Sequence, residues 1–141
     1  MRFVIDSNEF IFALGPSKEE KARKLLNLLL ERTHPHIVRI PRTIFEEIKR
    51  NLSIEAFREF NKLVNSITMI DEDFVVPFET VFKYEAAGFK PADAFIAAYT
   101  EYVGADILVS ENRHFLTHHS SLPFRILTAE KCLNLIKHPI K

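Results

Sequence analysis

Short apolar runs alternate along this chain with longer segments in which apolar residues recur every three or four positions. The short runs are typical of buried β-strands and lie at residues 3–5, 36–40, 67–70, 107–109 and 124–127. The helical spacing predicts helices over residues 8–14, about 17–32, about 43–51, about 53–65, 77–87 and 91–103, then a short helix before the last strand and a final helix from about residue 128. Strands separated by helices pair in parallel through right-handed crossovers. The pattern therefore predicts an α/β fold, a three-layer α/β/α sandwich with a parallel sheet of roughly five strands.

Local signals set the expected ends of these helices. The sequences Ser17-Lys18-Glu19-Glu20 and Thr43-Ile44-Phe45-Glu46 have the form of capping boxes, which predicts helix starts there. Pro77 and Pro91 suit the first helical position, whereas Gly88 and Gly104 suit the residue just past a helix end.

Composition narrows the class of protein. The 141 residues favour a single domain over 1–141, and 47% hydrophobic with 27% charged residues is an ordinary globular balance. Cys132 is the only cysteine, which excludes an internal disulfide and a Cys-based zinc cluster. Because no apolar run approaches the roughly 18 residues of a membrane span and residues 1–10 lack a signal-peptide pattern, we expect a cytoplasmic protein without membrane attachment.

Charge is balanced over the whole chain. Nineteen Lys and Arg residues oppose nineteen Asp and Glu residues. An anionic partner would therefore have to bind a local basic patch, because the molecule has no overall positive field.

Polar residues follow two of the predicted strands. In an open parallel sheet the ligand site lies outside the carboxyl ends of the strands. Asp6 comes directly after the first strand, and Ser110, Glu111 and Asn112 follow the fourth. Asp93 falls in the first turn of the helix that begins at Pro91. Taken singly, Asp6 is better explained as a helix cap and Asp93 as a carboxylate that suits a helix N-terminus.

A third carboxylate is placed by helical geometry. On the helix from Thr43, apolar residues form one stripe, and Glu47 lies nearer its edge than Glu46 does. We therefore expect Glu47 to lean toward a cleft and Glu46 to face solvent. Oxygen donors from three separate segments suit a hard cation such as Mg²⁺ or Mn²⁺, and without a cation such carboxylates repel one another. A divalent ion held there could activate water and neutralise charge on a phosphate, as in metal-dependent nucleases.

Four segments together resemble a known family, the PIN-domain ribonucleases, which include VapC-like toxins and RNA-processing proteins. The segments, in the family's order and over nearly the whole chain, are Val4-Ile5-Asp6-Ser7-Asn8, Ile44-Phe45-Glu46-Glu47-Ile48, Ala92-Asp93-Ala94-Phe95-Ile96-Ala97-Ala98, and Gly104 to Phe115. The resemblance implies that Asp6, Glu47 and Asp93 hold the metal and that Ser7, Asn8 and Ser110 support them.

The fourth acidic position departs from the family. The family most often carries Asp two residues after the Ser or Thr of that motif, and this chain carries Asn112. The resemblance leaves Glu111 or Asn112 to complete the metal site, directly or through water, and one or two ions remain open alternatives.

Several basic residues lie near the acidic segments: Arg42, Lys49, Arg50, Lys90 and Arg113. They are candidates for positioning contacts to an RNA backbone, and ordinary solvated charge is the alternative explanation for each.

These observations predict a metal-dependent endoribonuclease. The resemblance implies an RNA substrate and extends to toxins that pair with a small antitoxin and often form homodimers; a stand-alone RNA-processing role fits the residues equally well. The alternative is a PIN-like module that binds RNA or protein without cutting, which Asn112 favours. Three glycines exclude a P-loop or a dinucleotide fingerprint.

Overall fold

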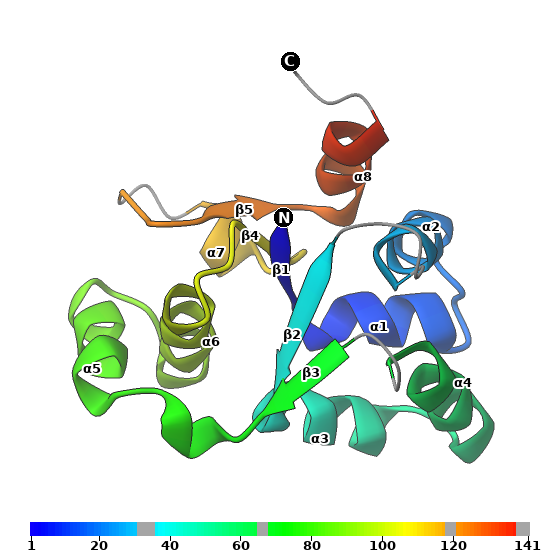
Figure 1. Ribbon diagram of the computed structural model, residues 1–141, viewed down its shortest axis with the longest axis horizontal. Helices are drawn as coiled ribbons and strands as arrows, with labels where there is room; N and C mark the ends of the chain where they lie inside the picture. Colours follow the sequence, from blue (N-terminus) through cyan, green and yellow to red (C-terminus); the bar gives the residue numbers. More distant parts are fainter. Residues whose placement is uncertain (31–35, 65–67, 118–120, 138–141) are drawn as a thin grey trace.

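A computed structural model describes residues 1–30, 36–64, 68–117 and 121–137 (Figure 1). These residues form a five-stranded sheet in the order β3-β2-β1-β4-β5, in which every neighbouring pair is parallel. The strands are β1 (Arg2–Ile5), β2 (Ile37–Pro41), β3 (Thr68–Asp71), β4 (Ile107–Val109) and β5 (Arg125–Leu127). The predicted parallel sheet is confirmed. The spatial order places β1, the first strand of the chain, in the middle.

Helices cover both faces of the sheet. They are α1 (Ser7–Leu14), α2 (Glu20–Leu30), α3 (Arg42–Asn51), α4 (Ile54–Val64), α5 (Phe78–Ala86), α6 (Pro91–Tyr102), α7 (Arg113–Leu116) and α8 (Ala129–Lys137), with a 3₁₀ turn η1 (Asp73–Val75). Figure 1 shows α1 to α4 on one side of the sheet, where α2 also packs on α8, and α5 with α6 on the other side. The three-layer sandwich is therefore confirmed.

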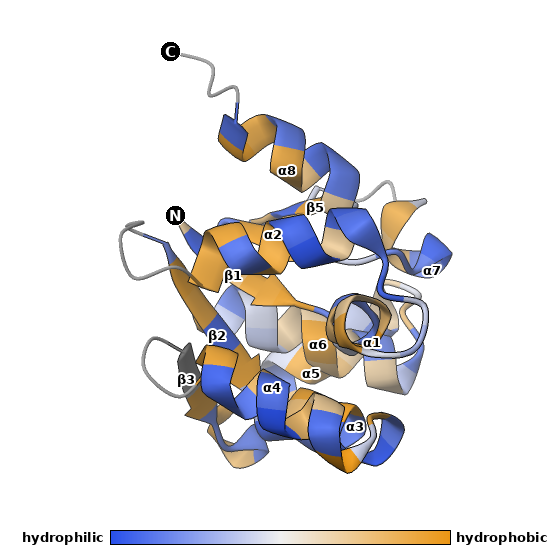
Figure 2. Cartoon of the chain, turned by 90° about the vertical axis from the view of Figure 1, so that its right-hand side faces the viewer, coloured by the Kyte–Doolittle hydropathy of each residue, from blue (hydrophilic) through white to orange (hydrophobic). Residues whose placement is uncertain are grey.

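Hydrophobic residues of the strands and of the inner helix faces form the core. Phe3, Val4 and Ile5 of β1 and Leu108 and Val109 of β4 are fully buried, as expected for central strands covered on both faces. Figure 2 shows the same division, with hydrophobic strands and mixed helices whose hydrophilic residues include much of the outer surface of α2 and α4. In the described part of the chain no helix is long and apolar enough to span a membrane.

Most of the predicted helix and strand boundaries are confirmed within a few residues, but the helix starts predicted from the two capping boxes are wrong. Helix α2 begins at Glu20, not Ser17, and the Ser17 hydroxyl donates to the Phe12 carbonyl. Helix α3 begins at Arg42 and has no side-chain cap of its own. Residues 31–32, 65 and 67, which we assigned to helix or strand ends, lie outside the described residues.

The start of α3 is instead capped from a distant segment. The backbone N–H of Thr43 donates to Asp73 Oδ1 at 3.0 Å, and the Thr43 hydroxyl donates to the other carboxylate oxygen. Arg42 forms an ion pair with Glu72 at 2.8 Å. The acidic turn after β3 thus satisfies one free N–H at the start of α3, that of Thr43, which Glu46 of a local capping box would have satisfied.

Two of the glycines end helices as expected. Gly88 follows α5 with φ of +102° and Gly104 follows α6 with φ of +66°, a backbone region that side chains with a Cβ rarely adopt.

Candidate functional site

Asp6 lies where the strand order reverses, between the carboxyl ends of β1 and β4. Its backbone N–H donates to the Val109 carbonyl at 2.9 Å, which continues the pairing of the two central strands by one residue. The same residue is the N-cap of α1, and its Oδ1 accepts the Ser7 N–H at 2.8 Å. The helix-cap explanation and the site explanation of Asp6 are therefore compatible, because the cap uses one oxygen.

Ser110 connects the ends of β1 and β4 through its side chain. Its hydroxyl is fully buried, donates to Asp6 Oδ2 at 2.8 Å and accepts the Asn112 N–H at 3.0 Å. The orientation of the Asp6 carboxylate is thus determined on both oxygens, by Ser7 and by Ser110.

The pKa of the Asp6 carboxyl depends on the acidic residues that surround it. Burial raises the pKa of the Asp6 carboxyl, the hydrogen bonds from Ser110 and Ser7 oppose this, and the charges of Glu47 and Asp93 raise the pKa further. Carboxylates from the end of β1, from α3 and from α6 therefore lie close enough to repel one another. The two other acids that the sequence analysis selected therefore both act on Asp6.

Glu47 and Glu46 differ in their surroundings. Both are half-buried on α3. The charge of Glu47 acts on Asp6, whereas the charge of Glu46 acts on Arg42 at the outer end of the helix. Glu47 is therefore the acid of this helix that faces the end of β1.

Asn112 occupies the position of the missing fourth acid. Its Nδ2 donates to Asp93 Oδ1 at 3.2 Å, and its Oδ1 accepts the His114 N–H at 3.0 Å as the N-cap of α7. The amide oxygen is engaged in the cap, so the side chain presents its NH₂ group to Asp93.

The donor set fits a hard cation in its chemistry, since it consists of carboxylate oxygens from three segments whose repulsion a cation would relieve. As the side chains lie, however, no group of three or more His, Cys, Asp or Glu residues in the described ranges is arranged to hold a metal ion. Coordination would thus require side-chain rotation from this arrangement.

Glu111 points to a different neighbour. Its Oε2 accepts the Ala129 N–H at 2.9 Å and so caps α8. Next to it lies Glu9 of α1, which is 1% exposed and which the sequence analysis did not select. Burial, followed by the hydrogen bond and the charge of Glu111, raises the pKa of Glu9 to about 9. The charge of Asp6 also contributes to the raised pKa of Glu9, so this residue lies beside the acids around Asp6.

The other selected residues are distributed around this centre. Ser7 is buried under Asp6, and Asn8 is exposed on α1. Lys49, Arg50 and Arg113 are exposed, Arg42 is paired with Glu72, and Lys90 Nζ lies 3.4 Å from His114 Nε2.

A second polar network closes the carboxyl ends of β2 and β3. Arg39 binds Asp71 through two hydrogen bonds, of 2.9 and 2.7 Å, and the Tyr99 hydroxyl donates to the same carboxylate at 2.6 Å. These contacts lower the pKa of Asp71 despite its partial burial. The network links the sheet to α6, the helix that carries Asp93.

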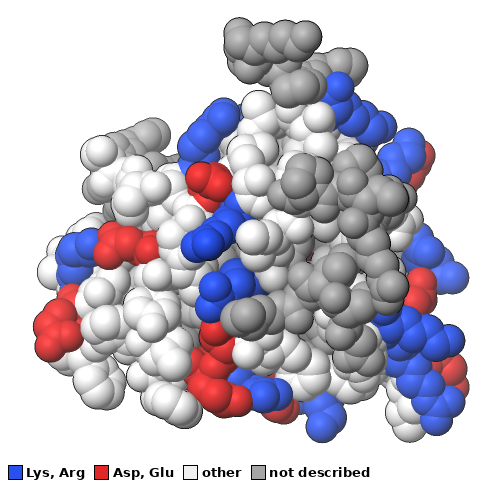
Figure 3. All heavy atoms as spheres, viewed as in Figure 1, with Lys and Arg blue, Asp and Glu red and all other residues white. Residues whose placement is uncertain are grey.

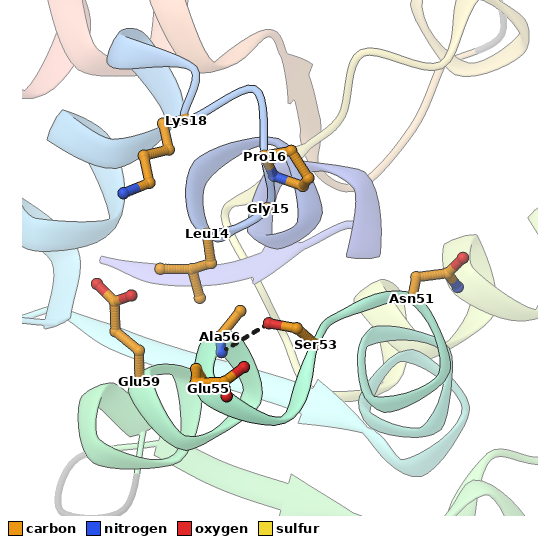
Figure 4. A pocket seen from close by; sticks show the side chains of 9 residues that line it. All are labelled: Leu14, Gly15, Pro16, Lys18, Asn51, Ser53, Glu55, Ala56 and Glu59. Carbon is orange, nitrogen blue, oxygen red and sulfur yellow. Dashed lines mark hydrogen bonds between the residues drawn. The ribbon is translucent and has the colours of Figure 1, made fainter.

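A pocket in the described residues lies away from these acids. It has a volume of about 410 Å³ between the turn after α1 and the turn between α3 and α4 (Figure 4). Lys18, which adopts φ of +43°, lines it opposite Glu55 and Glu59, and the Ser53 hydroxyl accepts the Ala56 N–H at the start of α4. None of the three converging carboxylates lines this pocket.

Comparison with known proteins bears on the fold. No protein-family model matches the chain, and no curated protein sequence is significantly similar to it. Among solved structures, a chain in the crystal structure of VapBC2 from Rickettsia felis bound to a DNA fragment from their promoter superposes with a TM-score of 0.61. The match covers 89% of this chain and 97% of that chain at 16% sequence identity. The chain has a PIN-like fold. The PIN-like fold explains the position of the acids at the carboxyl edge of a parallel sheet in the order 3-2-1-4-5.

Proposed function

We propose that this chain is an endoribonuclease that hydrolyses RNA phosphodiester bonds with Mg²⁺ or Mn²⁺, and that it is the toxin of a toxin–antitoxin pair. One observation supports the catalytic part: the charges of Glu47 and Asp93 act on the Asp6 carboxyl, which lies at the point where the strand order reverses. An open α/β sheet binds its ligand at this place, and clustered carboxylates are the usual means of holding a hard cation.

The residues of the chain have distinct tasks in this proposal. Ser110 and Ser7 orient Asp6, so that its carboxylate is held in place before any ligand arrives. Asp6, Glu47 and Asp93 would hold the ion, with Asn112 or Glu111 contributing directly or through water. A bound divalent cation supplies positive charge that activates water and neutralises the negative charge developing on the phosphate.

Basic residues near the acids would position the RNA. Lys49, Arg50 and Arg113 are exposed and free to contact phosphates, and Lys90 lies beside α7. Such contacts carry little sequence information, so they would fix the backbone rather than select a base.

The partner part of the proposal is supported by the fold match. The matched crystal contains VapBC2 with a promoter DNA fragment. By likeness of fold, we propose that this chain binds a small antitoxin protein and assembles as a homodimer in the cytoplasm.

The test measures RNA cleavage by the parent protein and by variants of the proposed site. RNA is incubated with the protein and Mn²⁺, and the experiment is repeated with Asp6→Asn and Asp93→Asn. The matched control is Asp106→Asn, because Asp106 precedes the amino end of β4, away from the proposed site, and accepts the Arg2 N–H at 2.8 Å. We expect cleavage by the parent and the control and loss of cleavage in both site variants. Cleavage that survives in both site variants would refute the assignment.

A second candidate function is supported by Asn112. Its amide hydrogen-bonds to Asp93 without needing a cation, which is the arrangement expected of a PIN-like module that binds RNA or protein without cutting. Measurable RNA binding by the parent without cleavage at any Mn²⁺ or Mg²⁺ concentration would favour this function.

A further inference from the structure

Three phenylalanines at a spacing of four residues are exposed along η1 and α5. Phe74 is 84% exposed, Phe78 77% and Phe82 61%. The rings of Phe78 and Phe82 stack on one another at a centroid distance of 6.3 Å, so together they form a continuous apolar surface. Large apolar patches of this kind are rare on monomeric proteins and usually mark interaction sites.

The surroundings of this aromatic face (Phe78 and Phe82 of α5, preceded by the exposed Phe74 of η1) are acidic. Lys83, the only basic residue of α5, is bound to Glu101 at 2.6 Å and lies over the ring of Tyr84. Glu79 and Glu85 of the same helix are exposed and form no ion pair with another described residue. In Figure 3 an uncharged area lies in the region where Figure 1 shows α5, with acidic side chains at its outer edge and a basic group next to an acidic one along its upper border.

The exposed glutamates of α5 lie where they would flank a ligand bound to the aromatic face. Glu85 is seven residues beyond Phe78 and therefore on the same side of the helix. It also lies in the last turn, where the helix carbonyls add partial negative charge. At the other end Glu72 is paired with Arg42, whereas Asp73 accepts hydrogen bonds from the neutral Thr43 and keeps its negative charge, which adds to that of α5.

We propose that the aromatic face of η1 and α5 binds an amphipathic helix of a partner protein, whose apolar side is flanked by Lys or Arg residues. The apolar side would cover the phenylalanines, and the basic residues would pair with Glu79 and Glu85. Charge argues against the other occupants: phosphates would be repelled, and a second copy of this chain would bring the same unpaired acids to the interface. The proposal does not depend on nuclease activity.

Synthetic peptides provide the probe. A fluorescent peptide of about 18 residues, composed of Leu and Lys at helical spacing, is titrated with the full chain and followed by anisotropy. Peptides of Leu and Glu in the same pattern, and of Leu and Lys in scrambled order, serve as ligand controls. The protein variants are Phe78→Ser with Phe82→Ser, Glu79→Gln with Glu85→Gln, and the control Ile54→Ser, which changes a 72% exposed residue of α4.

We expect the Leu/Lys helix to bind the parent and to bind the double phenylalanine variant at least about tenfold more weakly. The double glutamate variant should bind about threefold more weakly and Ile54→Ser as the parent does. Absence of binding, equal binding of the Leu/Glu peptide or the scrambled peptide, or insensitivity to the phenylalanine variant would each overturn the proposal. A dimer of the parent that dissociates in the phenylalanine variant, or RNA binding that this variant weakens, would also overturn it by identifying a different occupant.

Discussion

Replacing Glu9 by Gln should stabilise the protein at neutral pH. Glu9 is 1% exposed, and no described residue donates a hydrogen bond to its Oε1. Because burial and Glu111 raise the pKa of Glu9 from 4.5 to about 9, the folded protein keeps this side chain protonated at pH 7. Gln has the same shape, stays neutral at every pH, and can donate its NH₂ to Glu111 as the protonated acid does.

The sign and size of the effect follow from proton linkage. The folded state holds the proton over a range in which the unfolded state has released it, so the contribution of Glu9 is complete below pH 4.5 and is lost as pH rises toward 9. Each pH unit in this window costs about 1.4 kcal/mol, which amounts to about 3 kcal/mol at pH 7. We therefore expect Glu9→Gln to raise the free energy of unfolding at pH 7 by about 2–3 kcal/mol and the melting temperature by about 5–10 °C.

Urea unfolding of both proteins between pH 5 and 9, in EDTA so that no divalent cation contributes, measures this difference. It should be below about 1 kcal/mol at pH 5 and grow steadily with pH. Glu55→Gln is the matched control, because Glu55 is an exposed acid of α4, and it should change stability by less than about 0.5 kcal/mol. A difference that stays constant with pH, or a Glu9→Gln protein less stable than the parent at pH 8, would refute the reasoning.

Three further changes test the site and its support. Asp6→Asn keeps a good helix cap and removes a buried carboxyl group that has a raised pKa and is repelled by its acidic neighbours. Without metal the variant should melt at or above the melting temperature of the parent and should lose RNA cleavage; gross unfolding would contradict this. Ser110→Ala removes a fully buried hydroxyl that serves two hydrogen bonds, so chemical denaturation should show a loss of about 1–2 kcal/mol. Arg39→Met leaves the Asp71 carboxylate, whose side chain is 13% exposed, without its counterion, and should lower the free energy of unfolding by about 2–4 kcal/mol. Tyr99→Phe removes only one hydrogen bond to the same carboxylate and should lower it by about 1 kcal/mol; equal losses would show that the ion pair adds nothing beyond a hydrogen bond.

The alternation of short apolar runs with helical spacing was sufficient to predict the strands and the layers. Each of the predicted strands overlaps an observed one, because central strands buried on both faces must be apolar throughout. The starts of α2 and α3 could not be read in the same way. A capping box satisfies N–H groups locally, but the N–H of Thr43 is satisfied by Asp73, thirty residues away, and such a contact exists only after the chain has folded.

Part of the site could be predicted from the sequence, because two of its residues directly follow predicted strands. Asp6 and Ser110 stand directly after strands that lie side by side, so their meeting follows from the topology. The Glu9–Glu111 pair was missed, because it depends on which side α1 presents to the end of β4. A charged residue inside the apolar segment Ser7–Leu14 was nevertheless a signal that Glu9 is special. The partner of Asn112 could not be read from the sequence either, since the cap of α7 decides how its amide is turned.

The central place of β1 bears on biosynthesis. Of the five strands of the sheet, β1 is translated before the others, and it pairs on one side with β2 and on the other with β4, about a hundred residues later. Until residues 107–110 have been translated, Asp6 has neither its strand neighbour nor the Ser110 hydroxyl, and one edge of β1 stays open. A nascent chain therefore carries Asp6 long before the surroundings of that acid can assemble, and any activity of the site begins only after residues 107–110 have been translated.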